Sequence, residues 1–217
     1  MISIQDQKFI KSVVKKYIQE CLIECGFDPT IKEPGHTYGE NIEEKLVNKL
    51  VSKYPDKFSP PIKTKGKGKQ TRKMEDLIWI PTNDFINIKL GYEKGGGQPN
   101  MVSFTRLLEK YHSGEIDSYY IFIIDVSGKT KQSLTTKLYL FNLYHYLNYL
   151  NYNYGTGQVM LKEKQFFSEY DSNKYVDNTK KNIMLQLKEI ENDAFISHQK
   201  LKEIQHQKRQ EIFNDYC

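Results

Sequence analysis

The sequence predicts an α/β protein in which helices flank a central mixed β-sheet and a long helical segment follows at the C-terminal end. Three observations predict this fold. Apolar residues recur at helical spacing over 6–25 and 39–53, β-prone runs occupy 77–90 and 119–126, and residues 177–216 return to a helical pattern rich in Lys, Glu and Gln. A chain of 217 residues with this alternation is expected to form one domain spanning 1–217.

Composition restricts the class of protein. The hydrophobic content of 38% supports a folded core, and 32 basic against 27 acidic residues leave a net charge of +5, which permits a polyanionic partner. The three cysteines are expected to be reduced thiols, because no second Cys/His pair follows at zinc-finger spacing. No apolar run is long enough to cross a membrane and the N-terminal stretch carries charges throughout, so we expect a cytoplasmic protein without membrane contact.

Two helices are expected at the N-terminal end. The first covers 1–26 with Gly26 at its end, and is most simply a packing or dimerisation helix. Residues 29–38 form a loop, and the second helix runs from about Gly39 to Lys53. Its first turn carries Glu40, Glu43 and Glu44, which are either acids favoured by the helix dipole or contributors to a site.

A β-hairpin is predicted over 74–91. The apolar run 77–80 and the alternating run 85–90 flank a Pro-Thr-Asn-Asp turn. In the second strand Ile86, Ile88 and Leu90 share the buried face, while Asn87 and Lys89 share the other. With Asp76 before the first strand, the hairpin supplies an acid, an amide and a lysine, which are the parts that a metal-dependent phosphodiesterase needs. The alternative is an ordinary hairpin with a solvated Lys89.

Two segments around the hairpin favour contact with nucleic acid. Residues 63–73 hold six basic residues and no acid, so they form either a solvated linker or an arm along phosphates, with these residues as candidates: Lys65, Lys67, Lys69, Arg72 and Lys73. The glycine-rich stretch 91–100 lacks the Gly-Lys-Ser/Thr of a phosphate-binding loop. It is either a flexible surface loop or a close approach to DNA in which Gln98 and Asn100 pair with adenine.

The second half of the chain combines core elements with weaker candidates. A helix is expected over 103–111 with Ser103 as its cap, and 119–126 is the central strand, in which Asp125 has a structural role. Residues 128–131 form a basic turn that offers Lys129 and Lys131. The aromatic segment 134–154 is read as a strand and a packed helix, with base stacking as the alternative.

The last two segments complete the prediction. Residues 154–162 lead through Gly-Thr-Gly-Gln into a short strand, with Gln158 a DNA-contact candidate and Thr156 and Lys162 weaker ones. Residues 177–216 form one extended helix, or two helices hinged near Ser197, that serve as a cap or a dimerisation arm.

Taken together, Asp76, the Asn87-Ile88-Lys89 tripeptide and the Gly39-to-Glu43 stretch resemble the PD-(D/E)XK nucleases, over about residues 39–166. The segments around 91–100 and 154–162 are similar to those of type II restriction endonucleases. The sequence departs from the pattern in having Glu75 in place of Pro and Asn87 in place of an acid, and the second departure removes a negative charge from the metal site.

The resemblance implies a restriction endonuclease-like core and Mg²⁺-dependent, sequence-specific cutting of double-stranded DNA. It implies that Asp76, Asn87 and Glu43 hold Mg²⁺, with Glu44 as the substitute for Glu43, and that Lys89 acts on the nucleophile and the phosphate. A cytoplasmic homodimer of bacterial or phage-like origin follows from the same resemblance. Two alternatives stay open, namely a PD-(D/E)XK nuclease of repair or recombination and a non-catalytic DNA-binding protein.

Overall fold

The structure is a computed structural model that describes residues 1–31, 34–61, 75–92, 100–171 and 179–214. Along the chain, the helices and strands have these bounds: α1 Ile4–Glu24, α2 Pro34–Lys53, β1 Phe58–Ser59, β2 Leu77–Trp79, β3 Asp84–Tyr92, β4 Asn100–Ser103, α3 Phe104–Ser113, β5 Tyr119–Ser127, β6 Thr135–Asn142, β7 Leu150–Asn153, β8 Gln158–Leu161, α4 Glu163–Glu169 and α5 Lys180–Asn214.

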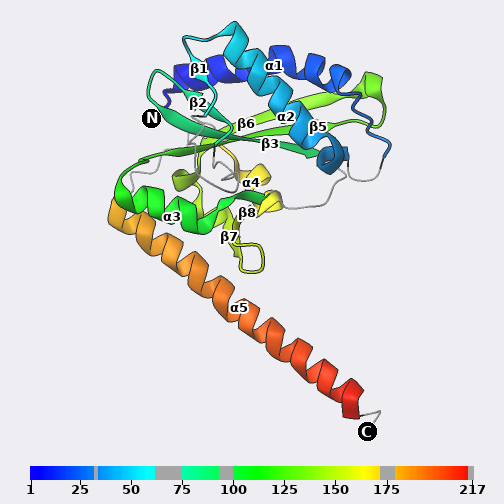
Figure 1. Ribbon diagram of the computed structural model, residues 1–217, viewed down its shortest axis with the longest axis vertical. Helices are drawn as coiled ribbons and strands as arrows, with labels where there is room; N and C mark the ends of the chain where they lie inside the picture. The colour runs from blue at the N-terminus through cyan, green and yellow to red at the C-terminus, as the bar shows by residue number, and fades with distance from the viewer. Residues whose placement is uncertain (32–33, 62–74, 93–99, 172–178, 215–217) are drawn as a thin grey trace, which may run out of the picture.

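The central sheet has five strands in the order β1-β2-β3-β5-β6. Strands β3 and β5 are parallel, and their connection contains α3, whereas the other neighbours in this sheet are antiparallel. The predicted α/β fold with a mixed central sheet is therefore confirmed. A second, antiparallel sheet has the order β4-β8-β7 and lies with α3 and α4 on the opposite side of the central sheet from α1 and α2 (Figure 1).

Two hydrophobic cores lie on the two faces of the central sheet. Strand β5 alternates between them, because successive side chains of a strand point to opposite faces. Tyr120, Phe122 and Ile124 join the core beneath α1 and α2, whereas Ile121 and Ile123 join the core that includes α3, β8 and the first part of α5. This double burial explains why β5 is apolar from Tyr119 to Ile124.

The predicted hairpin is confirmed, with Leu77 opposite Ile86 and Trp79 opposite Asp84. Asn83 takes a positive φ of 54° in the turn, a conformation that Asn tolerates better than most residues. Ile86 and Ile88 are buried in the first core, as alternation predicts.

One predicted helix start was wrong. Helix α2 begins at Pro34 and not near Gly39, which fits the tolerance of Pro in a first helical turn, where its missing N–H costs no helical hydrogen bond. The predicted start of α3 is confirmed, because the helix begins at Phe104 with Ser103 in the cap position, although the Ser103 side chain forms no hydrogen bond to the helix.

The aromatic segment also differs from the prediction. After β6 the chain forms two short 3₁₀ turns, 143–145 and 147–149, in place of a packed helix. The Asn142 side chain accepts a hydrogen bond from the backbone N–H of Tyr144 and so begins the first turn. Tyr144, Tyr146 and Tyr149 are buried, which supports a structural role for most of this segment.

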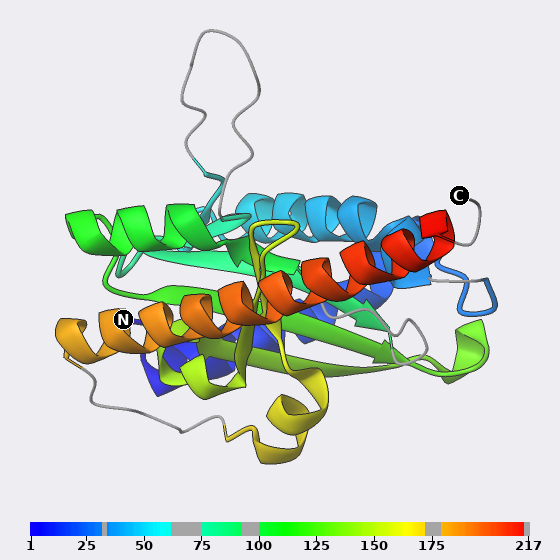
Figure 2. The same cartoon turned by 90° about the horizontal axis from the view of Figure 1, so that it is seen from below.

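Helix α5 is a single helix of 35 residues, so the hinge near Ser197 is not present. Its first part packs on the second core through Ile183 and Leu187, and its last part extends away from the rest of the molecule (Figure 1), while Figure 2 shows it crossing the face formed by β7 and β8. None of the described helices combines the length and the apolar content needed to span a membrane. Cys21 is buried and Cys25 is half-buried, and neither forms a disulfide bond within the described residues.

Candidate active site

One edge of β3 is only partly covered by its neighbour. Strand β2 pairs with Asp84, Phe85 and Ile86, and the backbone N–H of Asp76 adds a last hydrogen bond of 3.0 Å to the carbonyl of Ile86. On the other side, β5 pairs with β3 from Phe85 to Tyr92. Beyond Ile86, no strand among the described residues pairs with the edge of β3 that faces β2, and this stretch is called the open edge below.

Two carboxylates occupy this open edge. Asp76 Oδ2 accepts a hydrogen bond of 2.7 Å from the backbone nitrogen of Ile88, and Glu43 Oε1 accepts one of 2.8 Å from the backbone nitrogen of Leu90. Residues two apart in a strand direct their N–H groups to the same side, so the two acids are neighbours along one edge. Asp76 comes from the residue before β2 and Glu43 from α2, which packs across β3.

Burial makes both carboxylates harder to ionise. It raises the pKa of Glu43 to about 7, while the charge of Lys89 and the hydrogen bond from Leu90 act in the opposite direction. Burial also raises the pKa of Asp76, and Lys89 and the N–H of Ile88 again oppose the shift. The charge of Asp76 further raises the pKa of Glu43. The two acids and Lys89 thus form one electrostatically coupled group.

The structure separates the two glutamates that the sequence left as alternatives. Glu43 is partly buried and bonded to Leu90, whereas Glu44 is exposed. The position of Glu43 is not that of a solvated first-turn acid, because α2 begins at Pro34 and Glu43 lies well inside the helix. Of the two glutamates, Glu43 is therefore the one that reaches β3.

Asn87 and Lys89 lie on the face of β3 that is turned away from α1 and α2. Asn87 is 6% exposed, and its side chain hydrogen-bonds with the hydroxyl of Tyr119. The charge of Asp76 contributes to the raised pKa of Tyr119, which places this hydroxyl within the electrostatic reach of the site. Lys89 is partly exposed. Tyr119 was assigned to the core from its sequence, since its apolar context gave no signal of this polar contact.

The donor chemistry of the group fits a hard divalent cation. Glu43 and Asp76 offer carboxylate oxygens, each with one oxygen bonded to β3, and Asn87 adds an amide. Such oxygen ligands suit Mg²⁺, which is commonly held by one or two carboxylates and completed by water. Within the described ranges no three Asp, Glu, His or Cys side chains gather as a metal cluster, so the proposed ligand set depends on the amide.

The DNA-contact candidates are only partly described. Lys65, Lys67, Lys69, Arg72, Lys73 and Gln98 lie outside the described residues. Asn100 begins β4 and its backbone pairs with Met160. Lys129 and Lys131 are exposed in the turn after β5. Strands β3 and β5 are parallel and in register, so their last residues lie at the same end of the sheet. The turn after β5 is therefore at the end of the sheet where β3 also ends.

The candidates around β8 belong to the second sheet. Gln158 is half-buried at the first position of β8, opposite Asn153. Thr156 is exposed in the preceding turn, and Lys162 donates a hydrogen bond of 3.1 Å to the carbonyl of Asn148. The described contacts do not join these residues to the carboxylates at the edge of β3.

Comparison with known proteins assigns no family to the chain, since no family model and no curated protein matches it.

Proposed function

We propose that this protein is a Mg²⁺-dependent nuclease of the PD-(D/E)XK type that cuts double-stranded DNA at a fixed sequence, as a type II restriction endonuclease. The observation that carries the proposal is the pair of partly buried carboxylates, Asp76 and Glu43, on the open edge of β3. The charge of Lys89, which lies on β3, lowers the pKa of both carboxylates and so opposes the effect of burial. An acid before one strand and a lysine on the next are the two parts that such hydrolysis needs in proximity.

Each residue has a defined task in the proposed site. Asp76 and Glu43 hold the metal, because their shared burial disfavours two adjacent negative charges unless a cation offsets them. When bound there, Mg²⁺ would supply positive charge to offset that of the phosphate and would lower the pKa of water. Lys89 presents its ammonium group to the non-bridging oxygens of the phosphate and stabilises the charge that develops there. The N–H groups of Ile88 and Leu90 fix the orientation of the two carboxylates.

The order of elements supports the same assignment. The helix with Glu43, the strand after Asp76 and the strand with Lys89 follow one another, and α3 then connects β3 to the parallel strand β5. This order is similar to the restriction endonuclease-like core that the sequence resemblance implies. A homodimer is part of the proposal, because cutting both strands at a palindromic site matches two-fold symmetry.

A direct test is digestion of unmethylated phage DNA with Mg²⁺ at low and moderate salt. We expect discrete fragments from the intact protein and none from Lys89→Ala or Asp76→Ala. Two controls keep the charge changes matched, namely Lys137→Ala at an exposed position of β6 and Glu44→Ala beside Glu43, and both should still cut. Cutting that survives Lys89→Ala and Asp76→Ala would mean that the chemistry lies elsewhere in the molecule.

Asn87 favours one alternative, a DNA-binding protein without catalysis, because an amide stands where an acid would add negative charge to the metal site. Titration calorimetry separates the two functions. Binding of DNA without any binding of Mg²⁺ or Mn²⁺, and no cutting with either ion, would favour the non-catalytic protein. A nuclease of repair or recombination would instead cut branched or flapped DNA in preference to a linear duplex.

A further inference from the structure

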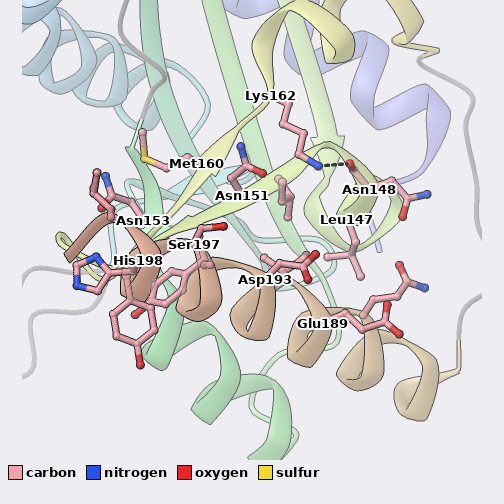
Figure 3. Close-up of a pocket in the computed structure, with 17 residues that line it drawn as sticks. Leu147, Asn148, Asn151, Asn153, Met160, Lys162, Glu189, Asp193, Ser197 and His198 are labelled. Atoms are coloured by element: carbon pink, nitrogen blue, oxygen red, sulfur yellow. Dashed lines mark hydrogen bonds between the residues drawn. The ribbon is translucent and has the colours of Figure 1, made fainter. Parts of the chain in front are cut away.

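A polar groove lies between α5 and the β7–β8 hairpin (Figure 3), and Glu43, Asp76 and Lys89 are not among its lining residues. Its volume is about 630 Å³, and residues from Gln186 to Leu201 of α5 form one wall. The opposite wall comes from the segment that includes Asn148, Asn151 and Lys162. The groove is therefore open along one side of a helix that continues beyond it.

The groove combines acidic residues on its α5 wall with apolar residues. Glu189 and Asp193 are one helical turn apart and exposed, and within the described residues neither forms an ion pair. Leu147, Ile190 and Ala194 provide apolar surface in the same groove. The surface is thus suited to a basic, amphipathic segment.

The distal part of α5 has the complementary composition. Every described residue from 199 to 210 is exposed, and this part extends away from the body of the molecule (Figure 1). It carries Leu201 and Ile204, which are 51% and 49% exposed. Its basic residues outnumber its acidic ones, with Lys200, Lys202, Lys208 and Arg209 against Glu203 and Glu211. A polar helix of this length gains little stability in water without a packing surface, so a covered state is favoured.

The apolar residues of α5 are spaced so that the helix can pair along one stripe. Residues 187, 190, 194, 197, 201 and 204 follow alternating steps of three and four, the pattern of a helix that pairs in this way. In an antiparallel pair along this stripe, residues 199–207 of one helix lie against residues 186–194 of the other, which include the acidic residues of the groove wall.

We propose that two copies of this chain associate through α5, the distal part of each helix lying antiparallel in the α5–β7 groove of the other. Asp193 and Lys200 directly precede Ala194 and Leu201 of the apolar stripe, and residues in this position face each other in an antiparallel pair. Asp193 of one subunit therefore lies opposite Lys200 of the partner subunit, and two-fold symmetry gives this pair twice. Leu201 of one subunit then covers Ile190 of the partner subunit. The same chain carries both the acidic groove wall and the basic distal part of α5. The segment that fills the groove is therefore the distal part of α5 from a second copy of the chain.

The proposal gives the homodimer of the proposed function a specific surface, but its test needs neither DNA nor Mg²⁺. Sedimentation equilibrium measures the dissociation constant of the full chain. We expect a dimer at micromolar concentration, dissociating about tenfold or more readily after Asp193→Lys or Lys200→Asp, since each change places like charges together at two positions. The double variant, with Asp193→Lys and Lys200→Asp together, should restore the dimer.

Two neutral neighbours on the outer side of α5 serve as matched controls. Asn192→Lys and Gln199→Asp introduce the same charges one residue away, and both should leave the dissociation constant unchanged. Far-UV circular dichroism checks that each variant keeps its helix content. A monomeric intact protein, a dimer that survives both single changes, or a double variant that does not recover would each overturn the proposal. Lys89→Ala should still dimerise even if it fails to cut DNA, so the two proposals fail separately.

Discussion

Glu43 Oε1 lies 2.8 Å from the backbone nitrogen of Leu90, so a helix side chain fills a hydrogen-bonding position that a neighbouring strand would otherwise fill. The contact joins α2 to β3 across 47 residues of sequence. It places a carboxylate where burial opposes its charge, which raises the pKa of Glu43 to about 7. The acid is therefore sensitive to pH near neutrality and to any nearby cation.

The first prediction concerns the stability of the metal-free protein against pH. The folded state binds the Glu43 proton more tightly than the unfolded state, so the free energy of unfolding should fall as pH rises from about 4.5 to about 7. A pKa shift of one unit corresponds to about 1.36 kcal/mol. Because Gln does not ionise, Glu43→Gln should lose up to about 3 kcal/mol less unfolding free energy over this pH range than the intact protein. The variant should therefore be the more stable of the two at pH 8. Urea unfolding with EDTA at several pH values measures the difference.

Glu44→Gln is the matched control for this experiment, because Glu44 is the exposed neighbour on the same helix. Its pH profile should coincide with that of the intact protein. Equal profiles for Glu43→Gln and Glu44→Gln would show that Glu43 is not buried against β3. Addition of Mg²⁺ should stabilise the intact protein at pH 8 more than it stabilises Glu43→Gln.

The second prediction concerns the amide in the proposed metal site. Asn87→Asp adds a third carboxylate beside Asp76, which should tighten Mg²⁺ binding about tenfold or more. Without metal the same change should destabilise the protein, because Asn87 is 6% exposed and an isolated buried charge is costly. Calorimetry measures the affinity, and Asn151→Asp at an exposed position of β7 is the control. Unchanged Mg²⁺ affinity in Asn87→Asp would remove residue 87 from the ligand set.

The third prediction concerns the turn after β5. Gly128 has a φ of 133°, and a Cβ atom added there would lie 2.5 Å from the backbone oxygen of Ser133. Gly128→Ala should therefore cost more than about 2 kcal/mol of unfolding free energy. Gly157→Ala is the comparison, since Gly157 has a φ of 69° but no atom within 4 Å of the added Cβ, and should cost about 1 kcal/mol. Equal losses in urea unfolding would contradict the close contact at Gly128.

The fourth prediction concerns how α5 is attached to the body. Leu187 is fully buried in the second core, so Leu187→Ala should cost about 2–5 kcal/mol of unfolding free energy. Leu185 is 49% exposed on the same helix, and Leu185→Ala should change stability by less than about 0.5 kcal/mol. Thermal unfolding of both variants at one protein concentration compares them. Similar losses would mean that α5 does not pack on the core in the way described.

Much of the fold was accessible from the sequence because its signals are local. The turn residues between Ile80 and Phe85 predicted the hairpin, and the apolar run from Tyr119 to Ile124 predicted a strand covered on both faces. Alternation also placed Asn87 and Lys89 on the opposite face of β3 from Ile86 and Ile88. The 3₁₀ turns after β6 were not predicted, because the side-chain contact of Asn142 begins them, and the start of α2 at Pro34 lies before the apolar periodicity that predicted the helix.

The candidate site was accessible only in part. Asp76, Asn87 and Lys89 are close in sequence, so their proximity follows from the hairpin itself. The choice of Glu43 over Glu44 depends on how α2 packs against β3, and the contact of Asn87 with Tyr119 depends on the pairing of β3 with β5. The groove beside α5 joins segments that are distant in sequence and has no local signal.

The open edge of β3 has a consequence for how the protein behaves in concentrated solution. Unpaired backbone groups on a strand edge invite the strands of other molecules, and charged side chains placed across such an edge discourage that pairing. Asp76 and Glu43 shield the N–H groups of Ile88 and Leu90 in this way. Variants that lose both carboxylates should therefore form β-rich aggregates more readily, so that resistance to aggregation and the proposed chemistry depend on the same pair of acids.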